Sequence, residues 1–475
     1  MKLETSLPVA VIGAGPVGLA AAAHLVSRGL TPIVFERGAS VGASLLEWGH
    51  VRVFSPWAYN VDAAARALLE AAGWDAPEPT DLPTGREIVE RYLAPLAALP
   101  PLAPAIRLSA RVIAITRLGL DKVSNRGRDT APFELRWIDA AGSEQASVVR
   151  AVIDASGTWA RPNPMGVDGL PVLGERAAAE FIDYGIPDVL GASRRRFAGR
   201  TVLVVGSGHS AINTALVLLR LQDAEPGTRV LWALRRNRIE RLLGGGLNDQ
   251  LPERGALGLA ARQAIDAGRL QVLAPFAATR LEPADGKLAV IGTLNQTQLT
   301  LLVDRIVVAT GFRPDLDLLS ELRVAVDPAT EAPPALSPLI DPNFHSCGTV
   351  PPHGVVELTQ PEANFFIVGS KSYGRAPTFL MATGYEQARS VVAELAGDPV
   401  AARQVHLVLP ETGVCSVSFA DGATPAAASC CGGPAEDSSS CCVADALAKA
   451  EGEAGCGCGT AAANPAGTTS TTEPA

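Results

Sequence analysis

Cysteine is almost missing from the body of this chain. Of its eight cysteines, only Cys347 precedes residue 415, and the other seven lie from Cys415 onward. A body so poor in cysteine gives no hint of the disulfide framework on which small secreted domains rely. The 475 residues and the apolar share of 47% are instead enough for two or three domains with sizeable hydrophobic cores.

Aromatic residues, unbalanced charge and long apolar runs are also scarce. Aromatics make up 5% of the chain while Ala, Gly and Val are abundant, which favours alternating strands and helices over a β-sandwich. A formal net charge of −9 without a long Lys/Arg cluster argues against nucleic acid or an anionic membrane surface as partner. The apolar run from Val9 is broken by Gly13, Gly15 and Pro16, so it predicts no membrane span. With no secretory signal visible, we expect a cytoplasmic protein.

The chain does contain two strand–turn–helix–strand units, and the first has Gly13-x-Gly15-x-x-Gly18 at its turn. In such a turn the first glycine permits the bend, the second lets the backbone approach a pyrophosphate, and the third lets helix and strand pack closely. The helix N-terminus adds free N–H groups and a partial positive charge. Glu36 closes the next strand, about twenty residues on, where a carboxylate can accept hydrogen bonds from ribose hydroxyls. We therefore predict an FAD site formed by Gly13, Gly15, Gly18, Glu36 and Arg37.

The second unit has Gly206-x-Gly208-x-x-Ala211 at its turn, and its next strand runs into Arg235-Arg236 with no acid. A carboxylate there would repel the 2′-phosphate of NADPH, whereas guanidinium groups can bind it bidentately. We therefore predict that Gly206, Gly208, Ala211, Arg235 and Arg236 bind NADPH. The alternative is that the two arginines are solvated surface charges. Two dinucleotide sites in one chain predict hydride transfer between them, and hence an oxidoreductase.

The order of these motifs resembles the two-dinucleotide-binding flavoprotein superfamily and, within it, the flavin-containing monooxygenases. The resemblance rests on the two glycine motifs, on Asp154-Ala155-Ser156-Gly157 and on Ala309-Thr310-Gly311. It implies an α/β fold with two Rossmann-like domains, in which the two Ala/Thr/Ser-Gly elements are the paired crossings between the FAD and NADPH domains. It also implies that Gly311 belongs to the FAD site.

The same resemblance implies an FAD domain in two segments with the NADPH domain inserted between them. After these domains the composition collapses into Ala, Gly, Ser, Thr, Pro and Cys. Such a segment cannot bury enough apolar surface to offset its ordering entropy, so we predict a disordered, Cys-containing tail. The predicted parts are residues 1–165 (FAD domain, first segment), 166–300 (NADPH domain), 301–410 (FAD domain, second segment) and 411–475 (tail).

Shorter segments are similar to a subgroup of flavoproteins associated with bacterial arsenic resistance. They are Trp48-Gly49-His50, residues 55–60, residues 343–348 and residues 371–375. This resemblance implies a monooxygenase that uses FAD, NADPH and O2. A flavin hydroperoxide would oxygenate a small soft nucleophile such as trivalent arsenic. The monooxygenase fingerprint Phe-x-Gly-x-x-x-His before the second glycine motif is not recognisable, and Tyr184-Gly185 stands in its place.

Two other functions stay open. One is an NADPH-dependent flavoprotein reductase that passes electrons to a partner, and the other is a non-catalytic flavoprotein that binds a metalloid. Disulfide reduction is not expected, because no Cys-x-x-Cys or Cys-x4-Cys pair lies near either glycine motif.

Catalytic candidates follow the first unit. In related monooxygenases an Asn of this region approaches the flavin, which points to Asn60, and the rings of Trp48, Trp57 and Tyr59 could wall a dry pocket. The alternative is that these aromatics pack in the core.

Soft-ligand candidates lie further along the chain. His345, Cys347 and His353 bracket a Pro-rich segment and could hold a soft ligand such as arsenite, although a lone Cys is usually a small buried hydrophobe. The thiols of the tail could capture a metalloid, or the tail could be inert. These thiols are Cys430, Cys431, Cys441, Cys442, Cys456 and Cys458.

Overall fold

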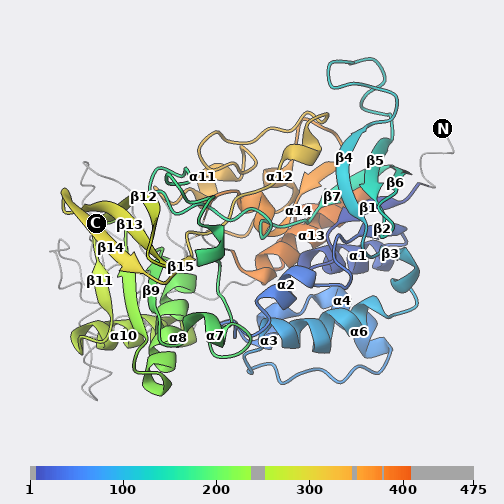
Figure 1. Cartoon of the computed structure of the whole chain (residues 1–475). Helices are drawn as coiled ribbons and strands as arrows, with labels where there is room; N and C mark the ends of the chain where they lie inside the picture. The colour runs from blue at the N-terminus through green and yellow to red at the C-terminus, as the bar shows by residue number, and fades with distance from the viewer. Residues whose placement is uncertain (1–6, 237–251, 345–349, 377–378, 408–475) are drawn as a thin grey trace, which may run out of the picture.

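Two parallel sheets, each carrying one glycine motif, form the framework of the chain (Figure 1). The computed structural model describes residues 7–236, 252–344, 350–376 and 379–407. The first sheet has the strand order β16-β7-β1-β2-β3. Its central strands β1 and β7 are buried along their whole length, and Asp154 at the end of β7 is their one charged residue. One face of this sheet packs on helices and the other on the antiparallel sheet described below, so both faces are covered. Its strands are β1 Val9–Ile12, β2 Pro32–Phe35, β3 Ile106–Arg107, β7 Ala151–Asp154 and β16 Phe365–Ile367.

The second sheet has the strand order β11-β10-β9-β15-β8 and is also parallel. Helix α8, His209–Ala224, follows its glycine motif and packs on β9 and β10. Its strands are β8 Ile182–Tyr184, β9 Thr201–Val205, β10 Arg229–Ala233, β11 Gln271–Leu273 and β15 Arg305–Val308. The predicted pair of Rossmann-like folds is therefore confirmed.

Two parts of the chain that are far apart in sequence build the first sheet and its helical cover. Strand β16 pairs with β7, and helix α13, Met381–Leu395, lies against α1, Pro16–Ser27 (Figure 1). The alanines from Ala20 to Ala23 in α1 are fully buried, and their small side chains let the two helices approach closely. The second sheet is thus inserted between two segments of the first, as the resemblance implied.

The return to the first sheet comes later than the predicted boundary at residue 300. Residue 300 lies inside β14, Thr297–Val303, and the next strand, β15, pairs with β9 and β8 of the second sheet. An antiparallel sheet, β12-β13-β14, precedes this last strand, so the second sheet is complete only at Val308.

Smaller elements complete the fold. A second antiparallel sheet, β4-β5-β6, lies next to the first parallel sheet (Figure 1). Among the described residues, no helix has the length and apolar content needed to cross a membrane. The remaining strands are β4 Arg111–Arg117, β5 Phe133–Ile138, β6 Glu144–Val149, β12 Phe276–Ala284 and β13 Lys287–Leu294. The remaining α-helices in the described ranges are α2 Ala43–Glu47, α3 Trp57–Asn60, α4 Ala63–Ala71, α5 Gly85–Ile88, α6 Ala94–Ala97, α7 Arg194–Phe197, α10 Pro252–Asp266, α11 Ser337–Ile340, α12 Val355–Leu358 and α14 Pro399–Arg403.

Candidate active site

The first glycine turn is closed on two sides and open on the third. Gly13 has φ of +98°, and a Cβ there would lie 2.7 Å from the carbonyl oxygen of Ala155. A Cβ at Gly18 would lie 1.9 Å from the carbonyl oxygen of Gly13, so only glycine lets the helix pack on the turn. A Cβ at Gly15 would meet nothing within 4 Å. The turn therefore presents open space at the N-terminus of α1, as a bound pyrophosphate requires.

Glu36 links this turn to the segment that follows β2 through its two carboxylate oxygens. The backbone N–H of Ala14 donates to Oε2 at 2.8 Å, and that of Gly38 donates to Oε1 at 2.7 Å. Each carboxylate oxygen can accept a second hydrogen bond, so the predicted contact with ribose hydroxyls remains compatible with this arrangement. Glu36 and Arg37 both line the cavity described below.

The second glycine turn repeats the first with a looser third position. Gly206 has φ of +138°, and a Cβ there would lie 2.3 Å from the carbonyl oxygen of Ala309. A Cβ at Gly208 would meet nothing within 4 Å. Ala211 occupies the third position and is fully buried, and the indole N–H of Trp232 donates to the carbonyl of Gly206 at 2.8 Å. The second turn is also open where a pyrophosphate would approach.

Arg235 and Arg236 follow β10, so they lie at the carboxyl edge of the second sheet, as does the glycine turn. This is the edge at which parallel sheets bind dinucleotides. Both side chains have interaction partners within the protein.

A single cavity of about 840 Å³ joins the two units. It begins at Gly13 and Gly15, passes the segment from Ser156 to Ala160, and reaches His209, Ser210 and Asn213 of α8. Its volume lies toward the upper end of the ~300–1,000 Å³ found for ligand pockets. The first glycine turn and the N-terminal part of α8 therefore line one continuous cavity.

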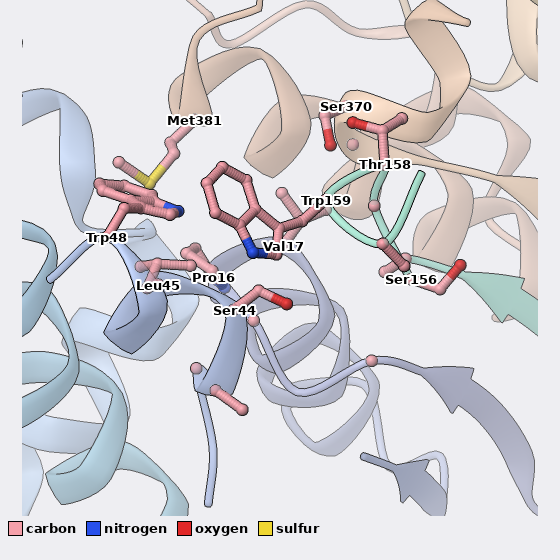
Figure 2. A pocket seen from close by; sticks show the side chains of 18 of the residues that line it. Pro16, Val17, Ser44, Leu45, Trp48, Ser156, Thr158, Trp159, Ser370 and Met381 are labelled. Carbon is pink, nitrogen blue, oxygen red and sulfur yellow. The ribbon is translucent and has the colours of Figure 1, made fainter. Parts of the chain in front are cut away.

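Aromatic side chains wall the middle of this cavity. Figure 2 shows the indoles of Trp48 and Trp159 side by side, with Met381 close to Trp48. The two ring centres are 6.4 Å apart. Trp159 also packs on Phe312 at 4.6 Å, and its N–H donates to Glu47 at 2.6 Å. The ring of Phe54 lies 5.6 Å from that of His209, across the junction of the two units.

The predicted catalytic residues lie outside the cavity lining. Trp57 and Asn60 are buried, and Trp57 belongs to the main apolar core, which matches the alternative of core packing. The amide of Asn60 donates to the carbonyls of Ser55 and Pro56, and its Oδ1 accepts from Ser55 Oγ. Tyr59 also does not line the cavity. The structure thus gives Asn60 a place in fixing its own loop. Ser55, the predicted wall residue Trp48 and the unpredicted Trp159 face the ligand space.

Gly311 is likewise placed away from the cavity. It follows β15 in the second sheet, and its carbonyl accepts from the backbone N–H of Asn163 at 2.9 Å. Gly157 and Gly369, which follow β7 and β16 of the first sheet, line the cavity instead. Both glycines could have been predicted from the sequence, because each follows a short apolar strand within three residues.

His353 lies in a buried hydrogen-bond chain. Its Nδ1 is 3.0 Å from the carbonyl of Pro351, so this nitrogen carries the proton, and the amide of Gln387 donates to Nε2 at 2.9 Å. Gln387 in turn accepts from the backbone N–H of Gly369 at 2.7 Å. Burial lowers the pKa of His353 from its ordinary value of 6.5. Both ring nitrogens are therefore occupied, which argues against His353 as a soft-metal ligand.

The other soft-ligand candidates lie outside the described residues. These are His345, Cys347 and all the thiols of the tail. The predicted disorder of residues 411–475 also lies outside the described residues. Within the described ranges no three His, Cys, Asp or Glu side chains form a group that could hold a metal ion.

Comparisons with known proteins agree with this architecture. Residues 7–332 match the family described as Pyridine nucleotide-disulphide oxidoreductase. The chain is 28% identical over 324 residues to the ferredoxin–NADP reductase of Lactiplantibacillus plantarum, covering 66% of this chain and 75% of the relative. It is 29% identical over 225 residues to indole-3-pyruvate monooxygenase YUCCA1 of Oryza sativa subsp. japonica, covering 46% of this chain and 47% of the relative.

A solved structure shows the same fold. Bacillithiol disulfide reductase Bdr from Bacillus cereus aligns with a TM-score of 0.57 at 18% identity, over 82% of this chain and 99% of that structure. Together with the family match, these findings confirm the predicted fold, the assignment as an oxidoreductase and the cofactors FAD and NADPH.

Proposed function

The chain belongs to the pyridine nucleotide-disulphide oxidoreductase family, and from this premise we propose that it is an NADPH-dependent flavin monooxygenase. Its substrate would be a small soft nucleophile with a lone pair, with trivalent arsenic as our candidate. NADPH, a proton, O2 and the nucleophile would give NADP⁺, water and the nucleophile carrying one new oxygen.

The single cavity shared by both dinucleotide units carries this proposal. Gly15 at one end and His209, Ser210 and Asn213 at the other line one continuous space. The residues fit the cofactors, because both glycine turns leave open space where a pyrophosphate binds. When bound, FAD supplies the redox chemistry: it accepts hydride from NADPH and passes electrons to O2. The chain's own part is to hold both dinucleotides against the same space.

The walls of this space support oxygen chemistry. Trp48, Trp159 and Phe54 present rings to it, so apolar surface replaces water around the reacting groups. A disulfide as electron acceptor is disfavoured, because no cysteine precedes Cys347 in the sequence. Reduction of a disulfide needs thiols beside the flavin, and neither glycine unit has one.

A reductase that passes electrons to a partner protein is the second candidate. The match to ferredoxin–NADP reductase covers 66% of this chain, whereas the match to the monooxygenase covers 46%. The two candidates share hydride transfer from NADPH and differ in the fate of the electrons.

The test uses purified, FAD-loaded protein. Anaerobic titration with NADPH is expected to bleach the flavin absorbance, and an unbleached flavin would contradict both candidates. The reduced protein is then mixed with oxygenated buffer, with and without arsenite. One arsenate formed per NADPH, with little free H2O2, is the expected result. The reductase would be favoured if the rate of flavin reoxidation is unchanged by arsenite, by a thioether and by an amine, but increases with an iron–sulfur acceptor protein.

A further inference from the structure

A buried ion pair lies directly behind the wall of the cavity. Nζ of Lys371 is 2.6 Å from Oδ2 of Asp154, and both side chains have no solvent exposure. Asp154 ends β7, and Lys371 lies in the 3₁₀ segment Gly369–Tyr373 that follows β16. Because β7 and β16 are neighbours, with Asp154 paired to Ile367, the ion pair joins the two chain segments of the first domain.

Such a pair is not explained by stability alone. Desolvation of two charges offsets much of their attraction, and an apolar pair of similar volume often stabilises a protein as well. A role for the two charges beyond stability should therefore be visible in their other contacts. Both of them contact Ser156, which lines the cavity and is exposed to it.

The hydrogen bonds of Ser156 determine what its hydroxyl can offer to a ligand. Its Oγ donates its one proton to Oδ1 of Asp154 at 2.6 Å, and its backbone N–H also donates to Oδ1, at 3.1 Å. Nζ of Lys371 donates to the same Oγ at 3.1 Å. A hydroxyl has one proton and two lone pairs. The proton and one lone pair are used, so the hydroxyl can offer a ligand only the remaining lone pair.

We propose that Lys371 and Asp154 are positioning residues that set Ser156 Oγ as a hydrogen-bond acceptor for bound FAD. The group that meets Ser156 must then be a donor, a hydroxyl or an N–H. Ser156 belongs to this cofactor's cradle because its Cα lies 3.1 Å from where a Cβ of Gly13 would be. Figure 2 shows Ser156 and Thr158 on the side of the cavity away from Trp48. The inference concerns FAD retention and does not depend on the proposed oxygen transfer.

Release of FAD from the full-length holoprotein on dilution, followed by flavin fluorescence, measures the effect. Ser156→Ala is expected to raise the Kd for FAD about tenfold, the usual loss for one good hydrogen bond. Ser156→Thr keeps the hydroxyl and is expected to stay within about twofold of the wild type. Ser27→Ala is the matched control, because Ser27 Oγ donates to the carbonyl of His24 on α1 and does not line the cavity.

The role of Lys371 is separated by a double-mutant cycle. Lys371→Met is expected to weaken FAD binding in the wild-type background and to add nothing in the Ser156→Ala background. Equal losses in both backgrounds would overturn the positioning role. A wild-type Kd in Ser156→Ala would overturn the proposal altogether. Should Lys371→Met fail to fold, the Ser156→Ala and Ser156→Thr pair still decides whether the hydroxyl accepts from FAD.

Discussion

The two glycine-motif units build the same turn under the same constraint. In both, the first glycine has a positive φ, and a Cβ would collide with the carbonyl that follows the neighbouring strand. That carbonyl belongs to Ala155 after β7 in the first unit and to Ala309 after β15 in the second. The glycine is thus demanded by the strand next to the turn, independently of any ligand. The parallel shows that sheet order imposes this part of the motif.

The units differ in how tightly the turn is supported. Gly18 brings α1 so close to the turn that a methyl group has no room, whereas Ala211 is accommodated in α8. Glu36 accepts from the Ala14 amide of the first turn and from the Gly38 amide after β2, while the second unit has arginines at the corresponding strand end. A tightly supported turn suits a resident FAD, and a looser one suits NADPH, which must leave after each turnover.

Substitutions at the third position of the two motifs should show the largest difference in stability between the units. Gly18→Ala forces a methyl against the Gly13 carbonyl, so we expect a loss of more than ~3 kcal/mol in unfolding free energy and loss of FAD. Ala211→Gly should cost only about 1–2 kcal/mol, from helix propensity and one buried methyl. Urea unfolding and flavin content measure both. Equal effects of the two variants would show that α1 and α8 pack on their turns alike.

Neutralising the charges at the ends of β2 and β10 should distinguish a residue that supports the turn from residues that select the nucleotide. Glu36→Gln can accept from only one of the two amides, so we expect a loss of about 1–3 kcal/mol in stability and weaker FAD binding. Arg235→Gln with Arg236→Gln should leave flavin content unchanged and lower the preference for NADPH over NADH about tenfold or more. Stopped-flow reduction with each nucleotide measures the preference. An unchanged preference would favour the alternative of surface charges for the two arginines.

The glycine turns could be predicted from sequence because their constraint is local. Strand, turn and helix follow one another within one unit, and the required φ and close contacts are encoded at fixed spacing. The position of Glu36 at the end of β2 follows from the same spacing, whereas its hydrogen bonds to the amides of Ala14 and Gly38 were not predicted. The sheet membership of β15 was not, because Thr310-Gly311 after it looks like Ser156-Gly157 after β7, and only the pairing partners distinguish the two strands.

The walls of the cavity depend on contacts between distant segments. Trp48 meets Trp159 across a long stretch of the first segment, and Gly369 lies against Val17 of the first helix only after the two segments of the first domain assemble. Asn60 was predicted as a catalytic residue from its residue type and its region, yet its amide forms its hydrogen bonds within its own loop. Sequence spacing carries no information on such pairs, which is why the catalytic candidates differ from the residues that face the cavity.

Acid should affect the first unit through His353. Its folded pKa is lowered by burial, with Pro351, Glu357 and Glu386 acting in the opposite direction. Below the unfolded pKa of about 6.5 the unfolded chain binds more protons than the folded one. The free energy of unfolding therefore decreases as the pH is lowered, by at most ~1.4 kcal/mol per pH unit. Above that pKa this contribution is constant. His353→Gln should flatten the slope between pH 7 and 5.5 in denaturant titrations, and an unchanged slope would contradict the assignment.

Substituting the middle glycine should change stability least and test the ligand sites most directly. Gly15 and Gly208 have ordinary extended backbones, with φ of −81° and −91°, and a Cβ at either would meet nothing within 4 Å. Alanine should therefore leave the free energy of unfolding of the apoprotein within ~0.5 kcal/mol of wild type. Gly15→Ala should lose FAD, because the methyl fills the space of the pyrophosphate. Gly208→Ala should keep FAD and raise the KM for NADPH. If Gly208→Ala instead lost FAD, or Gly15→Ala kept it, the two turns would have been assigned to the wrong dinucleotides.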